Sequence, residues 1–527
     1  MSHLRSEAAE IVAHGRHPHT LSGTEKLMVL LSVSVPSFMI NLDSNIVAVS
    51  LPSIARSLHA DFAAIEWVIS AYTLMFASLM MPAGALADRY GRKRVLVSGL
   101  AIFTLASLIC GAAPTVLILN VARALQGLGA ALQLSAALAI LSHGFRGAER
   151  ARAFAFWGSV IGIAMTLGPV VGGLITQKLG WQWAFYVNIP VGIVIIGIIL
   201  RSVRESRDPD AIGVDVPGLL TFSASLFLLT LGLISGNHHG WTSAAVLAEL
   251  LAAAALFATF LFVEARRSHP MLDLSFFRRS TYVGANVTGV AFAACFLTML
   301  TYLPLYFQGG LGASPTKAGL LMLPMAIPLF AGPRIVSAYL TYKLSGRTLL
   351  GTGLALVSAG LFWMAMVAPL FRYEAMLVGM MIAGCGAGIL NGEAAKVGMT
   401  VIPPERAGMA SGVGGTVRFS GIVIGFAALG AVLYQRIAGV IGATLGTEHA
   451  DAVTTLARAV AAGNLATSGH MALAARAFGA GYQMLLLSAA IFAGLSAVIA
   501  WLCIRADETP PVTKGDSAHA TLVLPVE

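Results

Sequence analysis

The stretch Gly84-Ala-Leu-Ala-Asp-Arg-Tyr-Gly-Arg-Lys-Arg94 contains the end of one apolar run, residues 64–87, and the charged segment 88–94 that joins it to the next, residues 95–113. As a helix, each run is long enough to cross the roughly 30 Å of hydrocarbon in a bilayer. A charged turn between two such runs indicates a pair of membrane-spanning helices, with the turn at the membrane surface.

Outward from this turn, the whole chain has the composition of a membrane protein. Of its 527 residues, 57% are apolar and only 11% are charged, against about 25% charged in an ordinary soluble domain. The predicted fold is therefore an all-α membrane protein with fourteen transmembrane helices. Besides the two runs above, we predict spans at residues 27–51, 115–142, 152–177, 184–202, 215–235, 243–264, 281–308, 316–342, 348–368, 373–402, 409–437 and 479–504.

The connecting loops show which side of the membrane each faces. One set of alternate loops holds most of the cations: Arg89, Arg92, Lys93, Arg94, Arg146, Arg150, Arg152, Arg201, Arg204, Arg207, Arg266, Arg267, Arg278, Arg279, Lys343 and Arg347. The opposite short loops hold only Arg56, Lys178, Lys317 and Arg372. Cytoplasmic loops are enriched in Lys and Arg, so both termini are predicted to be cytoplasmic. Because the net charge of +9 is spread over these loops, it does not indicate nucleic-acid binding.

A faint internal repeat suggests two halves. Gly91-Arg92 and Gly346-Arg347 take equivalent places if helices 1–6 and 9–14 correspond, and two-halved carriers bind substrate near the midplane, between the halves. The predicted organisation is a cytoplasmic tail (1–26), a six-helix bundle (27–203), two inserted helices (204–278), a second six-helix bundle (279–505) and a cytoplasmic tail (506–527). The second bundle includes an external loop at about 438–478, with a short surface helix around Ala450–Ala461.

Asp43 is the most informative ionisable residue, because a charge inside the bilayer costs several kcal/mol and marks a functional site by default. It lies about 12 Å from the outer end of the first helix, counted at 1.5 Å per residue. Arg123 lies at a similar depth in the fourth helix. We hypothesise that Asp43 binds a proton and that Arg123 tunes its affinity for it. The rival interpretation is a permanent ion pair that only holds the helices together.

A second cluster is expected in the cytoplasmic half. Glu393 and Lys396 are three residues apart, which places them on one face of a helix, and Arg418 lies on the next helix. They form either a second proton or substrate site, with Glu393 as its carboxylate, or a salt-bridge network. The residues predicted to line a substrate cavity are Trp67, Tyr72, Gln126, Gln133, Asn391, Lys396 and Arg418. For Trp67, an interfacial aromatic belt is the competing and favoured interpretation.

Enzyme chemistry is not indicated. Cys110, Cys295, Cys385 and Cys503 all lie in apolar runs without metal-site spacing, and Ser314-Pro-Thr-Lys317 lacks the partner motifs of a Ser-Lys enzyme. We predict no catalytic residues, no metal site and no cofactor.

Several of these stretches resemble the major facilitator superfamily, and within it the fourteen-helix drug:proton antiporters. The charged turn matches the superfamily loop between helices 2 and 3, which implies a conformational latch formed by Gly84, Asp88, Arg89, Gly91 and Arg92. The segment Arg123-Ala-Leu-Gln-Gly-Leu-Gly-Ala130 resembles the helix 4 motif, whose arginine is implicated in proton coupling. Gly168, Pro169, Gly172 and Gly173 resemble the antiporter motif of helix 5.

Further similarity extends over nearly the whole chain between the tails. It includes residues 41–52, 181–190 and 302–308. The chain departs from the pattern at Ala164, where a glycine is usual, at Ser135, where a proline is common, and at Lys343, which takes the place of Asp88 in the second half. Glu393 and Lys396 are not expected from the family pattern and suggest a specialised substrate.

The resemblance implies a proton-coupled exporter of amphipathic organic compounds or drugs, working by alternating access in a bacterial inner membrane. Its energy source would be the proton gradient, and its partners would be substrate, protons and the lipid bilayer. A periplasmic adaptor and an outer-membrane channel would be further partners. The alternatives are a dedicated metabolite or siderophore transporter of the same fold, and a non-transporting sensor or membrane enzyme.

Overall fold

The computed structural model describes residues 23–145, 147–207, 215–267, 270, 272–402, 407–445, 450–465 and 471–511. Within them it is built of helices and contains no strand. Fourteen helices are long and apolar enough to cross a membrane, and each corresponds to one predicted span, so the predicted count is confirmed. Most of the two predicted tails, and Arg146, lie outside the described residues.

The first six spans are formed by residues 23–202. Their helices are α2 (Gly23–Ser57), α3 (Phe62–Tyr90), α4 (Arg92–Gly111), α5 (Val116–Gly144), α6 (Gly147–Lys178), and the sixth span, α7 (Trp183–Tyr186) with α8 (Asn188–Ser202). The inserted pair consists of α9 (Val216–His239) and α10 (Ala244–Arg266). A short 3-10 turn, Leu274–Arg278, leads from this pair into the second half.

The second half repeats the six-span arrangement with more broken helices. Its spans are α11 (Ser280–Ala291) with α12 (Met299–Gly309), α13 (Pro315–Leu321) with α14 (Leu323–Ile335), α15 (Gly346–Val367), α16 (Tyr373–Met399), α17 (Ala407–Leu445) and α19 (Met471–Cys503). π-helical turns occur at Phe292–Leu297 and Val336–Leu340. Such turns inside α-helices often accompany functional sites.

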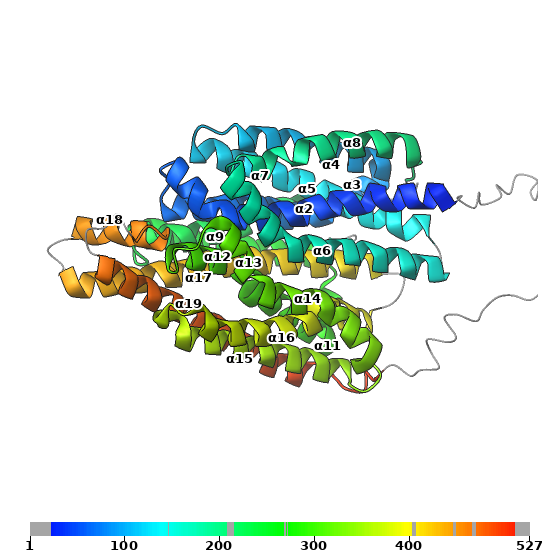
Figure 1. Cartoon of the computed structure of the whole chain (residues 1–527). Coiled ribbons are helices and arrows are strands. Elements are labelled where there is room, and N and C mark those ends of the chain that lie inside the picture. Colours follow the sequence, from blue (N-terminus) through cyan, green and yellow to red (C-terminus); the bar gives the residue numbers. More distant parts are fainter. Residues whose placement is uncertain are drawn as a thin grey trace, which may run out of the picture.

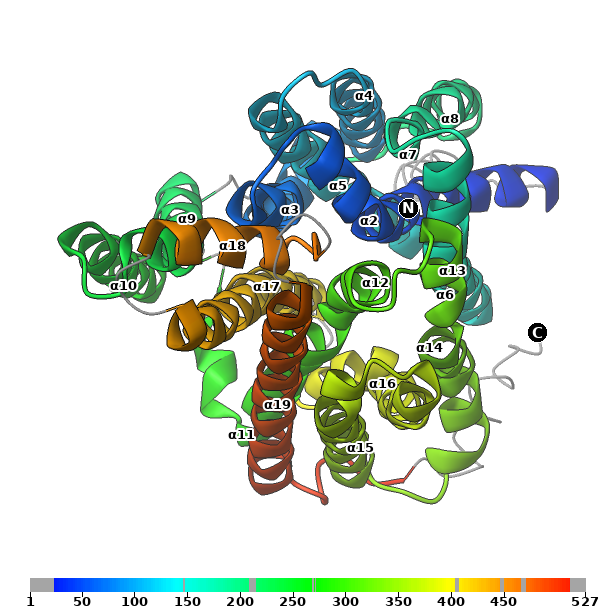
Figure 2. The same cartoon turned by 60° about the vertical axis from the view of Figure 1, so that its left-hand side comes forward.

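Figure 2 shows the two bundles side by side, with α2–α8 on one side and α11–α19 on the other. Between them, α3 packs on α17, and α6 packs on α13 and α14. The inserted pair lies at the outer edge, where α9 contacts both α3 and α17. The first residue of α2 and the last residue of α19 lie at the same end of the molecule. The short helix α18 (Ala450–Ala461) lies at the opposite end (Figure 1).

The internal repeat appears in the backbone hydrogen bonds. At the start of α4, Arg92 N donates to Ser206 O at 2.9 Å, and at the start of α15, Gly346 N donates to Thr509 O at 2.9 Å. In both halves, the chain that follows the last span thus binds the beginning of the third span. The two donors differ by one residue in the alignment of Gly91-Arg92 with Gly346-Arg347, but both lie at the first residue of a helix, which supports a common architecture of the halves.

The external segment is shorter than predicted. The helix α17 continues to Leu445 and α19 already begins at Met471, so the connection is 446–470 rather than 438–478. Its short helix α18 spans the predicted residues, Ala450–Ala461. The difference is explained by apolar packing between the two helices, which extends both beyond the length needed to cross the membrane. The side chains buried there are Tyr434 and Ile437 of α17 and Ala474 and Phe478 of α19.

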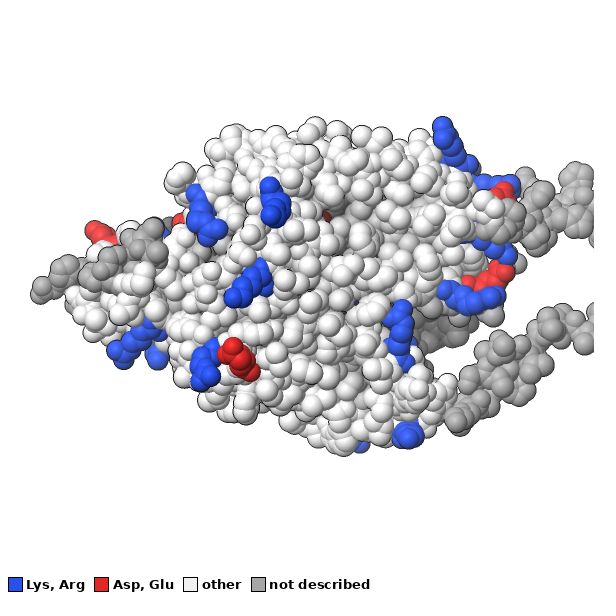
Figure 3. Space-filling model, in the orientation of Figure 1, with Lys and Arg blue, Asp and Glu red and all other residues white. Residues whose placement is uncertain are grey.

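The surface has the charge distribution of a membrane protein. In Figure 3 the Lys and Arg residues of the visible face form one group in the left half and another toward the right end, and few charged side chains lie between the two groups. Large apolar side chains are exposed on many of the spans, such as Leu117, Leu251 and Leu502. Such exposure is favourable in contact with lipid.

Candidate functional site

The strongest candidate site is a buried polar cluster around Asp43 of α2. Its Oδ2 accepts a hydrogen bond from Nη1 of Arg123 on α5 at 2.6 Å. Its Oδ1 accepts from Nε2 of Gln126 at 2.9 Å and from Nδ2 of Asn188 at 3.0 Å. Asp43, Arg123 and Gln126 have no exposed surface, and Asn188 is 2% exposed. Three helices of the first half, α2, α5 and α8, therefore supply this carboxylate and its three hydrogen-bond donors.

Arg123 is held from several directions. Its Nε donates to Val68 O of α3 at 3.0 Å, and its Nη1 also donates to Oε1 of Gln126 at 2.6 Å. The guanidinium lies 4.1 Å from the ring centroid of Tyr72, in cation–π geometry. Its Nη2 is buried and makes no hydrogen bond with a described residue. The Nη2 nitrogen of Arg123 therefore remains available as a donor, while Nε and Nη1 already donate hydrogen bonds.

The arrangement supports the predicted proximity of Asp43 and Arg123 and leaves their role open. A buried ion pair has a large desolvation cost, and removing one partner typically costs 3–5 kcal/mol. The amides of Gln126 and Asn188 offset part of that cost by donating to the carboxylate. Asn188 and Ser107, which accepts from Gln126 at 2.9 Å, were not among the predicted site residues. Their only sequence signal is a polar side chain inside an apolar span.

Two of the predicted cavity residues lie elsewhere. Nε2 of Gln133 approaches Gly99 O of α4 at 3.4 Å and is fully buried within the first half, so Gln133 stabilises the α4–α5 contact. The ring of Trp67 lies 5.9 Å from that of Phe227 on the inserted helix α9. Trp67 is therefore in contact with the inserted helix α9, and this contact decides neither for the belt nor for the cavity interpretation.

The second predicted cluster is only partly assembled. Lys396 and Glu393 form an ion pair in which Glu393 is nearly buried and Lys396 is largely exposed. Arg418 instead lies 5.2 Å from the ring centroid of Phe292, and no ion pair joins it to Glu393 among the described residues. The helix α16 breaks immediately before the pair, with Asn391 at ψ 102° and Gly392 at φ +96°. The pair thus begins a new helical segment.

Two of the five residues predicted to form the latch, Asp88 and Arg92, are in contact. Nε and Nη2 of Arg92 donate to Oδ1 of Asp88 at 2.9 and 2.6 Å. Between them, Gly91 has φ +111°, a conformation that side chains rarely adopt. Glu205, in the chain after α8, accepts from the backbone N–H groups of Lys93 and Arg94 at 3.0 and 3.2 Å. A carboxylate at a helix N-terminus is stabilising, so Glu205 ties α8 to the latch.

Glu205 was missed by the sequence reasoning, although a signal exists. It is the only acidic residue in the otherwise basic loop between Arg201 and Arg207. The remaining latch residues play different parts: Arg89 is exposed beside Tyr90, and a Cβ at Gly84 would meet no atom within 4 Å.

The predicted antiporter motif forms contacts between the helices of both halves. On α6, a Cβ at Gly168 or Gly172 would collide with Asn45 or Ile46 of α2. A Cβ at Gly173 would overlap the Pro315 carbonyl, and one at Gly319 would overlap the Pro169 carbonyl. Small residues permit this close backbone approach, so the motif joins the two halves through α6 and α13.

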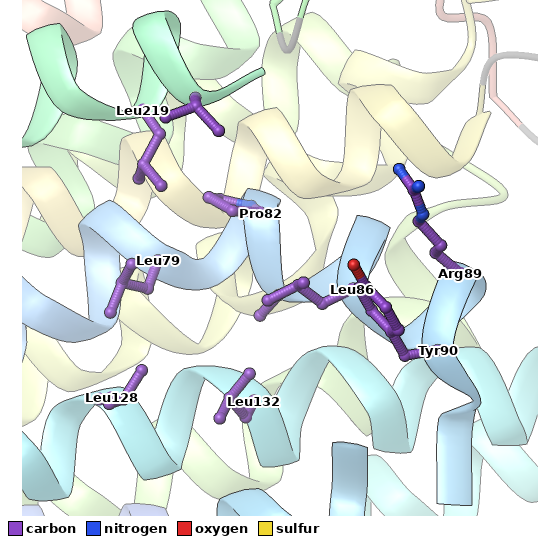
Figure 4. A pocket seen from close by; sticks show the side chains of 10 residues that line it. Leu79, Pro82, Leu86, Arg89, Tyr90, Leu128, Leu132 and Leu219 are labelled. Carbon is purple, nitrogen blue, oxygen red and sulfur yellow. The ribbon is translucent and has the colours of Figure 1, made fainter. Parts of the chain in front are cut away.

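An apolar groove of about 400 Å³ lies on the outside of the first half. Figure 4 shows its lining from α3, α5 and α9, with Leu79, Leu86, Leu128 and Leu219 along it and Arg89 and Tyr90 at one end. Because it does not lie between the two halves, it is not a candidate for the transport path.

The profile of the Major Facilitator Superfamily matches residues 34–426. The chain belongs to this superfamily. It is 37% identical over 412 residues to the multidrug resistance protein Stp of Mycobacterium tuberculosis, covering 77% of this chain and 76% of Stp. It is 33% identical over 455 residues to the methylenomycin A resistance protein of Streptomyces coelicolor, covering 86% and 92% of the two chains.

Solved structures show the same fold. A bacterial homologue of the human lysosomal transporter Spinster, in an inward-facing and occupied conformation, superposes with a TM-score of 0.68, 16% identity and coverage of 93% of this chain and all of that chain. The chain described here is therefore a multi-pass transporter of the inner membrane and not an enzyme.

Proposed function

We propose that this transporter exports amphipathic organic compounds, drugs among them, in exchange for protons. The cargo class is supported by two similar proteins whose names denote multidrug and methylenomycin A resistance. The proton is supported by one observation above the others, the buried Asp43 carboxylate in contact with Arg123.

The geometry gives the carboxylate two ways to be neutralised. In the present arrangement Arg123 balances its charge through the 2.6 Å hydrogen bond. A proton on Asp43 would do the same and would free the arginine, whose Nη2 already lacks a partner. Protonation at Asp43 would therefore weaken the α2–α5 ion pair, and the alternating movement of the two halves would use that change. Glu393, paired with Lys396, is proposed as a second proton-responsive carboxylate near the cytoplasmic side.

The test is transport in everted membrane vesicles, with drug uptake and proton movement recorded together. Wild type is expected to accumulate drug and to release protons from the vesicle lumen. Asp43→Asn should lower the rate of drug-dependent proton movement by at least about tenfold, because the amide cannot exchange a proton. The matched control is Asp451→Asn on the exposed face of α18, which should transport normally. Unchanged proton movement in Asp43→Asn would disprove the assignment.

A periplasmic adaptor and an outer-membrane channel are proposed only as partners that receive the cargo beyond the membrane. The exposed element at the outer end is α18, which is where an adaptor would bind. The purified chain in proteoliposomes is expected to transport drug across the bilayer alone. Transport that appears only after an adaptor is added would show that the adaptor is part of the pump itself.

A further inference from the structure

Glu66 is a buried carboxyl group at the boundary between the two halves. It lies on α3, four residues after that helix begins at Phe62, and is 1% exposed. It faces α17 of the other half, where a Cβ at Gly430 would overlap Oε1 of Glu66 and lie 2.7 Å from the Tyr302 hydroxyl. The glycine thus leaves the space that the carboxyl group occupies.

No partner balances this carboxyl group. Oε1 of Glu66 is buried without a hydrogen bond, and no ion pair to Glu66 occurs among the described residues. The Tyr302 hydroxyl beside it donates to Phe426 O at 2.6 Å.

The charged and titratable groups around Glu66 supply no cation to it. Asp61, the residue that caps the start of α3 through Ala64 N, is acidic and offers no positive charge. From the other half, the hydroxyl of Tyr482 on α19 donates to Tyr302 O at 3.0 Å. Farther out, Arg458 of α18 hydrogen-bonds Tyr434 of α17. The surroundings therefore favour a neutral group at Glu66, because a buried ion without a partner costs several kcal/mol.

The outer ends of the two halves are in contact in this structure. Thr316 N donates to Oε1 of Gln177 at 3.3 Å, and Nε2 of Gln308 donates to Val49 O at 2.8 Å. Glu66 lies at the same end, since α3 begins there and contacts α18. Separation of the outer ends would expose Glu66 to water, where an ionised carboxylate is stable at neutral pH.

We propose that Glu66 is a protonation site that controls closure of the outer end: the two halves close around the neutral acid, and an ionised Glu66 holds them apart. Each closure at the outer side would then take up one proton. The proposal adds a further proton site, besides Asp43 and Glu393, to the exchange proposed above and rests on alternating access, but not on Asp43. In this proposal Gly430 leaves the space for the Glu66 carboxyl group in the closed form, because only a residue without a side chain has room for it.

The test measures the separation of the outer ends directly. Spin labels at Arg56→Cys on α2 and Arg372→Cys between α15 and α16 report it, both positions being exposed. Cys385 and Cys503 are replaced by Ser, and Asp43→Asn removes the proton-binding carboxylate proposed above. Pulsed electron paramagnetic resonance gives the distance distribution between about pH 5 and pH 9, a range that lies above the pKa of an exposed Glu and reaches that of a buried one.

With Glu66 intact, the ratio of open to closed molecules is expected to rise with pH, by at most about tenfold per unit for one proton. Glu66→Gln, a neutral isostere, should stay closed at every pH. Glu249→Gln is the matched control. This residue of α10 also has a buried, unpartnered carboxylate oxygen, but it lies against Gly232 inside the inserted pair, so its variant should keep the pH response.

Variants of Gly430 test the proposal independently, in case Glu66→Gln does not fold. Gly430→Ala should favour the open form at all pH values, and Gly430→Ala with Glu66→Ala should close again because the methyl group then has room. A pH response that persists in Glu66→Gln, or is absent with Glu66 intact, would overturn the proposal. Since the measurement uses no drug and no gradient, its result is independent of whether drug:proton exchange itself is observed.

Discussion

Nη1 of Arg123 lies 2.6 Å from Oδ2 of Asp43, and neither side chain has any exposed surface. The two residues come from helices α2 and α5 of the same half, so this ion pair does not have to break when the two halves move. Only a change in its own charge alters it, and a proton is the smallest agent that can make that change.

A double-mutant cycle separates the functional role of this pair from a purely structural one. Arg123→Gln should destabilise the protein by about 3–5 kcal/mol, because it leaves a buried carboxylate unpaired. Asp43→Asn with Arg123→Gln should recover much of that loss, as measured by thermal unfolding in detergent. If the pair only holds the helices, the double variant should also recover transport. We expect it to remain inactive.

The interface glycine Gly173 should be intolerant of any larger side chain. Gly173→Leu would drive α6 away from the Pro315 carbonyl of α13, so drug transport should fall by about tenfold or more, while each half keeps its own packing. Gly158→Leu is the control on the same helix, since a Cβ there meets no atom within 4 Å. Equal transport by the two variants would contradict the proposed role of the motif in joining the halves.

The contact of Glu205 with the start of α4 should be visible in local exchange rates. Glu205→Gln removes the charge that the amides of Lys93 and Arg94 face, an interaction worth about 1 kcal/mol at a partly exposed helix N-terminus. Hydrogen exchange in this segment should accelerate about fivefold. The corresponding start of α15, at Gly346 and Arg347, should exchange as before, and acceleration at both sites would indicate general destabilisation instead.

The break in α16 should depend on Gly392. Its φ of +96° is strained for any residue with a Cβ, at a cost of about 1–2 kcal/mol, so Gly392→Ala should lower the unfolding temperature and slow transport. Gly289→Ala in the regular part of α11 meets no neighbouring atom and should have neither effect. An unaltered rate in Gly392→Ala would show that the Glu393–Lys396 segment does not need this break.

The architecture followed from the sequence because lipid imposes one rule on every span: its backbone must satisfy its own hydrogen bonds over about twenty apolar residues. The count of spans was predictable on that basis, whereas the short surface helix Ala450–Ala461 was predicted from an Ala-rich stretch outside the spans. The ends of α17 and α19 were not, since packing between those helices extends them past the length that the membrane requires.

The site residues also differ in how far the sequence could predict their positions. Depth counted along two helices was enough to predict that Asp43 and Arg123 lie at one level. Depth does not tell which neighbour a side chain faces, so the contacts of Gln133 with α4 and of Trp67 with α9 could not be predicted. Glu66 had no sequence signal at all: near the start of a span, a lone glutamate has the pattern of a surface residue. Its burial is decided by Gly430, on a helix of the other half, and only tertiary structure brings two such distant residues together.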